Sequence, residues 1–134
     1  MPTLTALYSG ELRCEARHVQ SGNTLVTDAP TDNQGRGEAF SPTDLVCAAL
    51  TTCMITTMGI LAGREGINLT GLKAETTKIM QGNPRKIAQI QVRLIIPNLE
   101  ATDAQKGMLK NAALTCPVAL SLAETISQQV SFDF

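Results

Sequence analysis

A chain of 134 residues, 43% of them hydrophobic, has the size of one domain that buries a core of its own, and we expect a single domain over residues 1–134. A net charge of −1 without a long basic run argues against a nucleic-acid partner. One histidine and four cysteines without a Cys-x-x-Cys pair exclude the usual zinc spacings, and we see no secretory signal at the start, so we expect a cytosolic, metal-free protein.

The first 28 residues predict an antiparallel meander of strands. Two sets of residues alternate along this stretch: Leu12, Cys14, Ala16 and His18 with Arg13, Glu15, Arg17 and Val19. The turn formers at 21–23 then precede a short apolar run. The stretch from Asp28 to Glu38 is almost wholly polar and rich in turn formers. It predicts a surface loop, and such loops often carry functional side chains.

The segment Ser41-Pro42-Thr43-Asp44 is the strongest helix start in the chain. Ser41 suits the cap, Pro42 suits the first helical position, and Asp44 suits the return bond of a capping box. The predicted helix runs through residues 45–62 and ends near Gly66.

This helix includes nineteen residues without a charge, 45–63, which is about the length of a membrane span. Its threonines, and the amphipathic strands that need a packing partner, favour a buried core helix and no membrane. Because the helix is apolar on all sides, one small domain has little material to surround it, and this favours a dimer.

The second half of the chain predicts a hairpin, two helices and a closing strand. Residues 72–80 and 87–96 read as the hairpin, with alternate apolar residues of the second strand on one face. A capping-box pattern opens a helix at 102–114, which Pro117 interrupts; a new helix is expected at 117–127 and a strand at 130–134.

The cysteines differ in what their surroundings predict. Cys116 falls at the N-terminus of the helix that restarts at Pro117, where unpaired N–H groups favour a thiolate, so electrostatics alone makes it the more acidic thiol. Cys53 lies mid-helix, where it is reactive only if a cation or donor meets it. A buried small hydrophobe is the alternative for each, and we assign Cys14 and Cys47 to packing.

Two segments resemble motifs of the OsmC/Ohr family. The segment 40–53, FSPTDLVCAALTTC, resembles the family's helix, in which a Ser-or-Asn-Pro start, an alanine-rich run and a cysteine follow in this order. The segment 113–120, ALTCPVAL, resembles its second motif, Cys-Pro-Val followed by an apolar helix. With the order of strands and helices, the resemblance covers nearly the whole chain.

The resemblance implies an intertwined α+β homodimer in which antiparallel sheets wrap around long central helices. It also implies a cysteine-based peroxidase without a cofactor, acting on organic hydroperoxides or hydrogen peroxide. Cys53 would attack the peroxide and become a sulfenic acid, and Cys116 would condense with it to a disulfide. A dithiol reductant such as a lipoyl protein would reopen the bond. We follow the family in giving the attack to Cys53, against the electrostatic argument.

The family also implies an arginine beside the attacking thiolate and a carboxylate ten residues before it. Here the carboxylate position is Thr43, and Asp44 is adjacent. Arg36 is the first choice for the arginine, as the only one in the loop before the helix, while Arg13 and Arg17 are alternatives.

The displaced carboxylate leaves two rival functions open. One is an OsmC-like dimer that binds a small apolar ligand and keeps both thiols reduced. The other is a structural protein with four inert cysteines.

Overall fold

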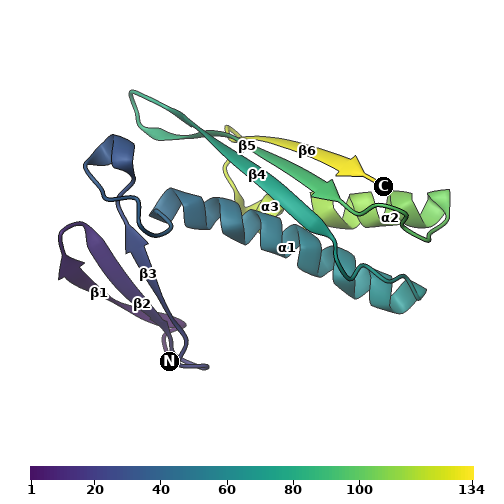
Figure 1. The fold of residues 1–134 in the computed structure, drawn as a ribbon, viewed down its shortest axis with the longest axis horizontal. Coiled ribbons are helices and arrows are strands. Elements are labelled where there is room, and N and C mark those ends of the chain that lie inside the picture. Colours follow the sequence, from purple (N-terminus) through teal and green to yellow (C-terminus); the bar gives the residue numbers. More distant parts are fainter. The chain divides into compact units, whose positions relative to one another are not determined.

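The computed structural model describes all residues from 1 to 134 (Figure 1). The chain divides into two compact units, residues 1–46 and residues 47–134. Hydrogen-bonded strands form one three-stranded sheet in each unit.

The first unit is the predicted antiparallel meander. Strands β1 (Leu4–Gly10), β2 (Arg13–His18) and β3 (Thr24–Asp28) pair in sequence order. The strands that the alternation predicts are therefore confirmed. The buried residues of this unit are all polar: Thr27, Asp28 and Ser41.

The loop after β3 folds back on the meander. It contains one short helical turn, η1 (Thr31–Asn33), and it is tied down where Ala29 N–H donates to the Leu12 carbonyl at 3.1 Å. A Cβ added at Gly35 would lie 1.6 Å from the Ala29 carbonyl oxygen, so only glycine allows this approach. The predicted polar loop is thus confirmed, and it has a defined backbone path.

Helix α1 (Pro42–Glu65) begins and ends where the sequence predicts. Ser41 N–H donates to the Asp44 carboxylate at 3.0 Å, and Asp44 N–H donates to the Ser41 hydroxyl at 3.1 Å, which completes the capping box. Gly66 follows the helix with φ +68°, in the left-handed region that favours glycine.

The burial of α1 is one-sided within this chain. Its buried residues recur at helical spacing and form one stripe: Cys47, Leu50, Met54, Met58 and Ala62. The opposite side is exposed at Thr52, Thr56 and Gly59. By length and composition α1 could cross a membrane, and 28% of its most apolar 18-residue window is buried within the chain. A single copy of the chain therefore does not surround this helix.

The second unit packs helices on one face of a mixed sheet. Strands β4 (Lys73–Gln81) and β5 (Lys86–Ile95) form the predicted hairpin, and β6 (Ser127–Asp133) lies along the other side of β5. Figure 1 shows α1 and α2 (Asp103–Leu114) on the same face of this sheet. The alternate apolar residues of β5 are buried there, as predicted: Ile90, Val92 and Leu94, followed by Ile96.

Two expectations for this unit are wrong. Strand β6 pairs with β5 in parallel, because α2 and α3 form a crossover between them, so the sheet is mixed and not purely antiparallel. Helix α3 (Pro117–Ser121) ends six residues before the predicted 127. Two side chains donate hydrogen bonds to backbone carbonyls of this short helix. The Ser121 hydroxyl donates to the Pro117 carbonyl, and the Gln128 amide of β6 donates to the Ala119 carbonyl. The chain then turns into the strand.

Candidate thiol site

Cys53 lies in the middle of α1 and is partly exposed. Its neighbours along the buried stripe, Leu50 and Met54, have no exposed surface. Cys53 thus sits at the edge of the core. Its backbone carbonyl accepts a hydrogen bond from the Thr57 hydroxyl at 3.0 Å, and Thr57 also donates to the Ala112 carbonyl of α2 at 3.2 Å.

Cys116 occupies the N-cap of α3, as the break at Pro117 predicts. Its backbone is extended, and the Ala119 N–H donates to its sulfur at 3.4 Å. The residue is 1% exposed. Cys53 and Cys116 therefore differ in their access to solvent.

The expectation that the helix end lowers the pKa of Cys116 below its ordinary value is wrong. Burial raises the pKa of Cys116 above its ordinary value, and this is the largest effect. The backbone N–H groups of Ala119 and Val118 act in the direction that the helix end predicts and lower the pKa, but burial outweighs them. The interaction with Cys53 raises the pKa of Cys116 further.

Cys53 is thus one of the causes of the raised pKa of Cys116, although the two cysteines come from different helices. Both are free thiols. A partly exposed sulfur that an oxidant reaches, beside a buried thiol that condenses with the product, is what a reversible disulfide requires.

Arg36 and Asp44 belong to the first unit, and each has a partner there. Arg36 forms an ion pair with Glu11, and both side chains are largely exposed. Asp44 completes the capping box with Ser41, so its predicted capping role is confirmed. Arg17 lies near the C-terminal end of β2, and its guanidinium lies beside Gly22.

Arg13 makes a bidentate ion pair with Asp28. It donates from Nε to Oδ1 of Asp28 at 2.7 Å and from Nη2 to Oδ2 at 2.9 Å, and Glu38 N–H donates to the same carboxylate at 3.1 Å. Asp28 is 2% exposed. Hydrogen bonding and charge from Arg13 lower the pKa of Asp28 in spite of its burial. Arg13 also reaches the Glu38 carboxylate at 3.3 Å.

Sequence reasoning missed Asp28 as a partner for Arg13. The two residues face each other across β2 and β3, a register that needs a hairpin centred between Gln20 and Ser21. We placed the turn at 21–23, and that choice moves residue 28 out of register with residue 13. In the structure the bend starts at His18, where Gly22 N–H donates to the His18 carbonyl at 2.8 Å, and no residue type in the sequence signals that start.

Two cysteines lie apart from the thiol pair. Cys14 is half-buried on β2 and lines a cavity of about 250 Å³ within the first unit, together with Tyr8 and Pro30. Cys47 is buried in the first turns of α1.

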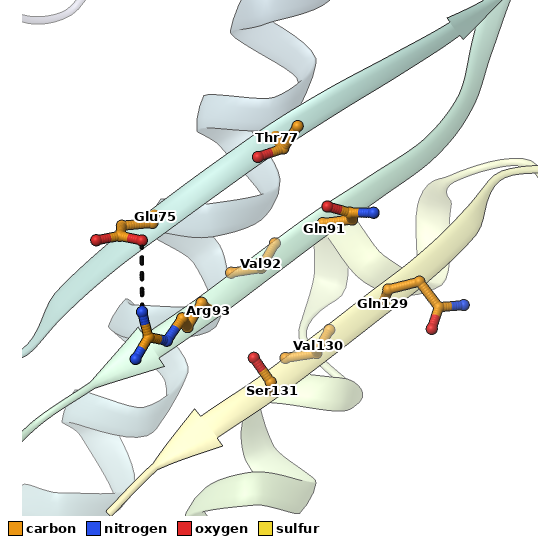
Figure 2. Close-up of a pocket in the computed structure, with 8 residues that line it drawn as sticks. All are labelled: Glu75, Thr77, Gln91, Val92, Arg93, Gln129, Val130 and Ser131. Atoms are coloured by element: carbon orange, nitrogen blue, oxygen red, sulfur yellow. Dashed lines mark ion pairs between the residues drawn. The ribbon is translucent and has the colours of Figure 1, made fainter.

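A larger hollow, about 420 Å³, lies on the sheet of the second unit. Figure 2 shows its polar side chains on the face that points away from the helices, where Glu75 pairs with Arg93 at 3.7 Å. Polar side chains are the usual covering of a sheet face that meets water. This hollow contains neither thiol.

Comparison with known proteins identifies relatives of this chain. The family model described as OsmC-like protein matches residues 35–131. A crystal structure from Psychrobacter arcticus 273-4, whose name places it among osmotic stress induced and detoxification response proteins, is 45% identical. This chain covers 96% of that chain with 98% of its own residues, at a TM-score of 0.93.

More distant structures share the fold. An organic hydroperoxide resistance protein OsmC from Legionella pneumophila is 15% identical, with 100% of this chain and 98% of that chain covered and a TM-score of 0.75. An organic hydroperoxide resistance protein from Vibrio cholerae, with captopril bound in one of its active sites, is 17% identical, with 99% and 92% covered and a TM-score of 0.71. No curated protein matches the sequence significantly.

Proposed function

This chain belongs to the OsmC-like protein family, and on that basis we propose that it is a thiol peroxidase that reduces organic hydroperoxides or hydrogen peroxide. The observation that carries the proposal is the pair of free thiols, one partly exposed and one buried, of which the first contributes to the raised pKa of the second. The names of two structural neighbours, both organic hydroperoxide resistance proteins, support the substrate class.

In the proposed reaction the Cys53 thiolate attacks the terminal oxygen of the hydroperoxide. The O–O bond breaks, Cys53 becomes a sulfenic acid and the alcohol leaves. Cys116 then attacks the sulfenic sulfur, which gives the Cys53–Cys116 disulfide and releases water. A dithiol reductant, for which we propose a lipoyl protein, reopens the disulfide by thiol–disulfide exchange. Each turnover thus consumes one hydroperoxide and one dithiol.

The order of the two thiols is supported by their surroundings. The peroxide arrives from solvent, and Cys53 is the more exposed sulfur. A buried thiol with a raised pKa is a poor first nucleophile, because the thiolate is the reactive form. Cys116 therefore suits the second step.

Arg36 remains our proposed cation for the Cys53 thiolate, with Asp44 as its proposed carboxylate. An exposed ion pair is worth about 0–1 kcal/mol, so Arg36 can leave Glu11 at little cost. Arg13 is the alternative, already oriented by a buried carboxylate. Separate Arg36→Gln and Arg13→Gln variants decide between them. We expect R36Q to slow Cys53 oxidation about tenfold or more, and R13Q to act mainly on stability.

We further propose a cytosolic homodimer. The uncovered side of α1 supports it, because a long apolar helix without a partner on one side is unusual in a water-soluble protein. Sedimentation equilibrium of the reduced protein tests this state directly. A monomer at all concentrations would contradict it.

One titration tests the enzymatic proposal. The reduced protein receives one equivalent of cumene hydroperoxide, and mass spectrometry maps its disulfides. We expect a Cys53–Cys116 bond, a trapped sulfenic acid at residue 53 in Cys116→Ser, and no reaction in Cys53→Ser. Cys14→Ser is the matched control and should react like the native chain. Thiols that stay unmodified after long exposure would instead favour a dimer that binds a small apolar ligand.

A further inference from the structure

The first unit contains a cavity of about 250 Å³ that the proposed reaction does not use. Its lining includes a row of three side chains on neighbouring strands, Tyr8 of β1, Cys14 of β2 and Thr27 of β3. Residues that pair directly across antiparallel strands point to the same face of the sheet, so the strand register brings these three together. Neither Cys53 nor Cys116 lines the cavity.

The other walls of the cavity are mainly apolar, and hydrogen bonds hold them in place. They include Leu12, Ala29, Pro30 and Pro42. The Ala29 N–H donates to the Leu12 carbonyl at 3.1 Å, and the Asn33 N–H donates to the Pro30 carbonyl at 2.9 Å. Walls that are fixed before a ligand arrives reduce the entropy that is lost on binding. The cavity is therefore suited to bind a ligand without rearrangement.

One polar side chain of the cavity has no partner. The Thr27 hydroxyl makes no hydrogen bond within the chain, although the residue is only 9% exposed. Every fully buried side-chain oxygen or nitrogen has a partner, so the Thr27 hydroxyl reaches open space, and the cavity is the space that Thr27 lines. A polar group that is largely removed from water is costly without a partner. A ligand that forms a hydrogen bond with Thr27 removes that cost.

The volume limits the size of such a ligand. An apolar cavity of about 150 Å³ binds benzene, whereas sites for drug-sized ligands have about 300–1,000 Å³. The volume here therefore suits one small ring with a substituent, and it is too small for a nucleotide. The ring of Tyr8 adds a flat apolar surface, and its hydroxyl is fixed by the Leu12 N–H, which donates to it at 3.2 Å.

We propose that this cavity binds a small apolar molecule that carries one hydroxyl or carbonyl group. The hydrocarbon part contacts Tyr8, Pro30 and Pro42, and the polar group forms a hydrogen bond with the Thr27 hydroxyl. The bound molecule shields the Cys14 thiol from solvent. The inference does not rest on the proposed peroxidase function, because the whole lining lies within residues 8–42 of the first unit.

Two residues of the lining give signals that report on binding in the native protein. Tyr8 is the one tyrosine of a chain without tryptophan, so tyrosine fluorescence comes from this cavity alone. Cys14 is a free thiol, and mass spectrometry measures the rate at which methyl methanethiosulfonate modifies it. Cyclohexanol, which does not fluoresce, is the probe, and it should change the Tyr8 emission in a saturable manner. At about ten times its Kd it should slow Cys14 modification about tenfold, because only the empty cavity reacts.

A pair of matched variants tests the role of the hydroxyl. Thr27→Val removes the hydroxyl and keeps the branched shape of the side chain. One neutral hydrogen bond corresponds to about a threefold to tenfold change in affinity, so T27V should weaken cyclohexanol binding by that factor. Thr24→Val is the control on the same strand, since Thr24 is exposed and does not line the cavity. Its affinity for cyclohexanol should equal that of the native protein.

Several results would overturn the inference. Tyr8 emission that does not saturate, or Cys14 modification that cyclohexanol does not slow, would show that the cavity does not bind the probe. Equal affinities of T27V and the native protein would exclude the hydroxyl as the polar contact. A Cys14 thiol that does not react in the folded protein without cyclohexanol would show that a second copy of the chain covers the cavity. Each of these results leaves the peroxidase proposal intact, because the cumene hydroperoxide titration tests that proposal through Cys53 and Cys116.

Discussion

The two units of this chain are stabilised by different means. Every buried hydrophobic residue lies in the second unit, from Cys47 to Ala119. The first unit buries only the polar residues Thr27, Asp28 and Ser41, while large apolar side chains of its strands such as Leu7 and Tyr8 are exposed. Its loop is held instead by backbone hydrogen bonds and by Arg13 on Asp28.

Because of this difference, the proposed reactive thiols and the arginines proposed to assist them belong to units that are stabilised by different means. Cys53 and Cys116 belong to the unit with a packed interior, where burial raises the pKa of Cys116. The arginines proposed to assist them belong to the unit whose structure depends on charge. A three-stranded sheet with little apolar burial is marginal by itself. We therefore expect core changes to affect stability in the second unit and charge changes to affect the first.

The largest effect should come from the interior of the second unit. Leu94 is fully buried on the central strand β5, between Ala74 of β4 and Phe132 of β6. Leu94→Ala should lower the free energy of unfolding by about 2–5 kcal/mol, since it removes apolar contact and leaves a cavity. Urea unfolding at a fixed protein concentration measures it.

The matched control for this change is Leu7→Ala in the first unit, where the side chain is 69% exposed. Surface substitutions usually change stability by about 0.5 kcal/mol or less. A cost for L7A close to that of L94A would remove the contrast between the units, and it would indicate that a second copy covers β1.

Much of this fold follows from local sequence signals. Both capping boxes, the break at Pro117 and the alternation along β5 depend on residues within one turn or one strand. The errors concern pairing at long range. The parallel arrangement of β6 depends on the crossover through α2 and α3, and the early end of α3 depends on Gln128, a residue of the next strand.

For the site, too, the sequence predicts local features and not those that depend on the whole fold. The position of Cys116 at a helix N-terminus follows from Pro117, but the direction of its pKa shift does not, because burial depends on the whole second unit. The pairing of Arg13 with Asp28 required the strand register, which a turn signal fixes only to within a few residues. Short-range chemistry was visible in the sequence, whereas desolvation and partner choice were not.

A smaller effect should come from the buried carboxylate of the first unit. Asp28→Asn removes the charge that Arg13 holds and should loosen the loop at 29–40, with a loss of stability at neutral pH below that of L94A. Limited proteolysis of the loop and the urea midpoint measure the two effects.

The pH dependence identifies the cause of that loss. The pKa of Asp28 is lowered by folding, so its contribution is present above the ordinary range of a carboxyl group, near about 3.9, and is lost as the pH falls through the folded-state pKa. The difference between the native chain and D28N should therefore shrink as the pH falls below about 4. A difference that stays constant down to the acid transition would show that the new amide side chain disturbs packing and that the ion pair is not the source.

The smallest effect should come from the exposed ion pair of the same unit. Glu11→Gln removes the partner of Arg36, and both side chains are largely exposed, so solvent screens their attraction. The free energy of unfolding should change by about 0.5 kcal/mol or less, and less still in 1 M salt. Arg36→Gln should cost equally little stability, although it should slow Cys53 oxidation if Arg36 serves that thiolate. A cost for E11Q as large as that for D28N would mean that burial of the carboxylate does not decide which ion pair holds the first unit together.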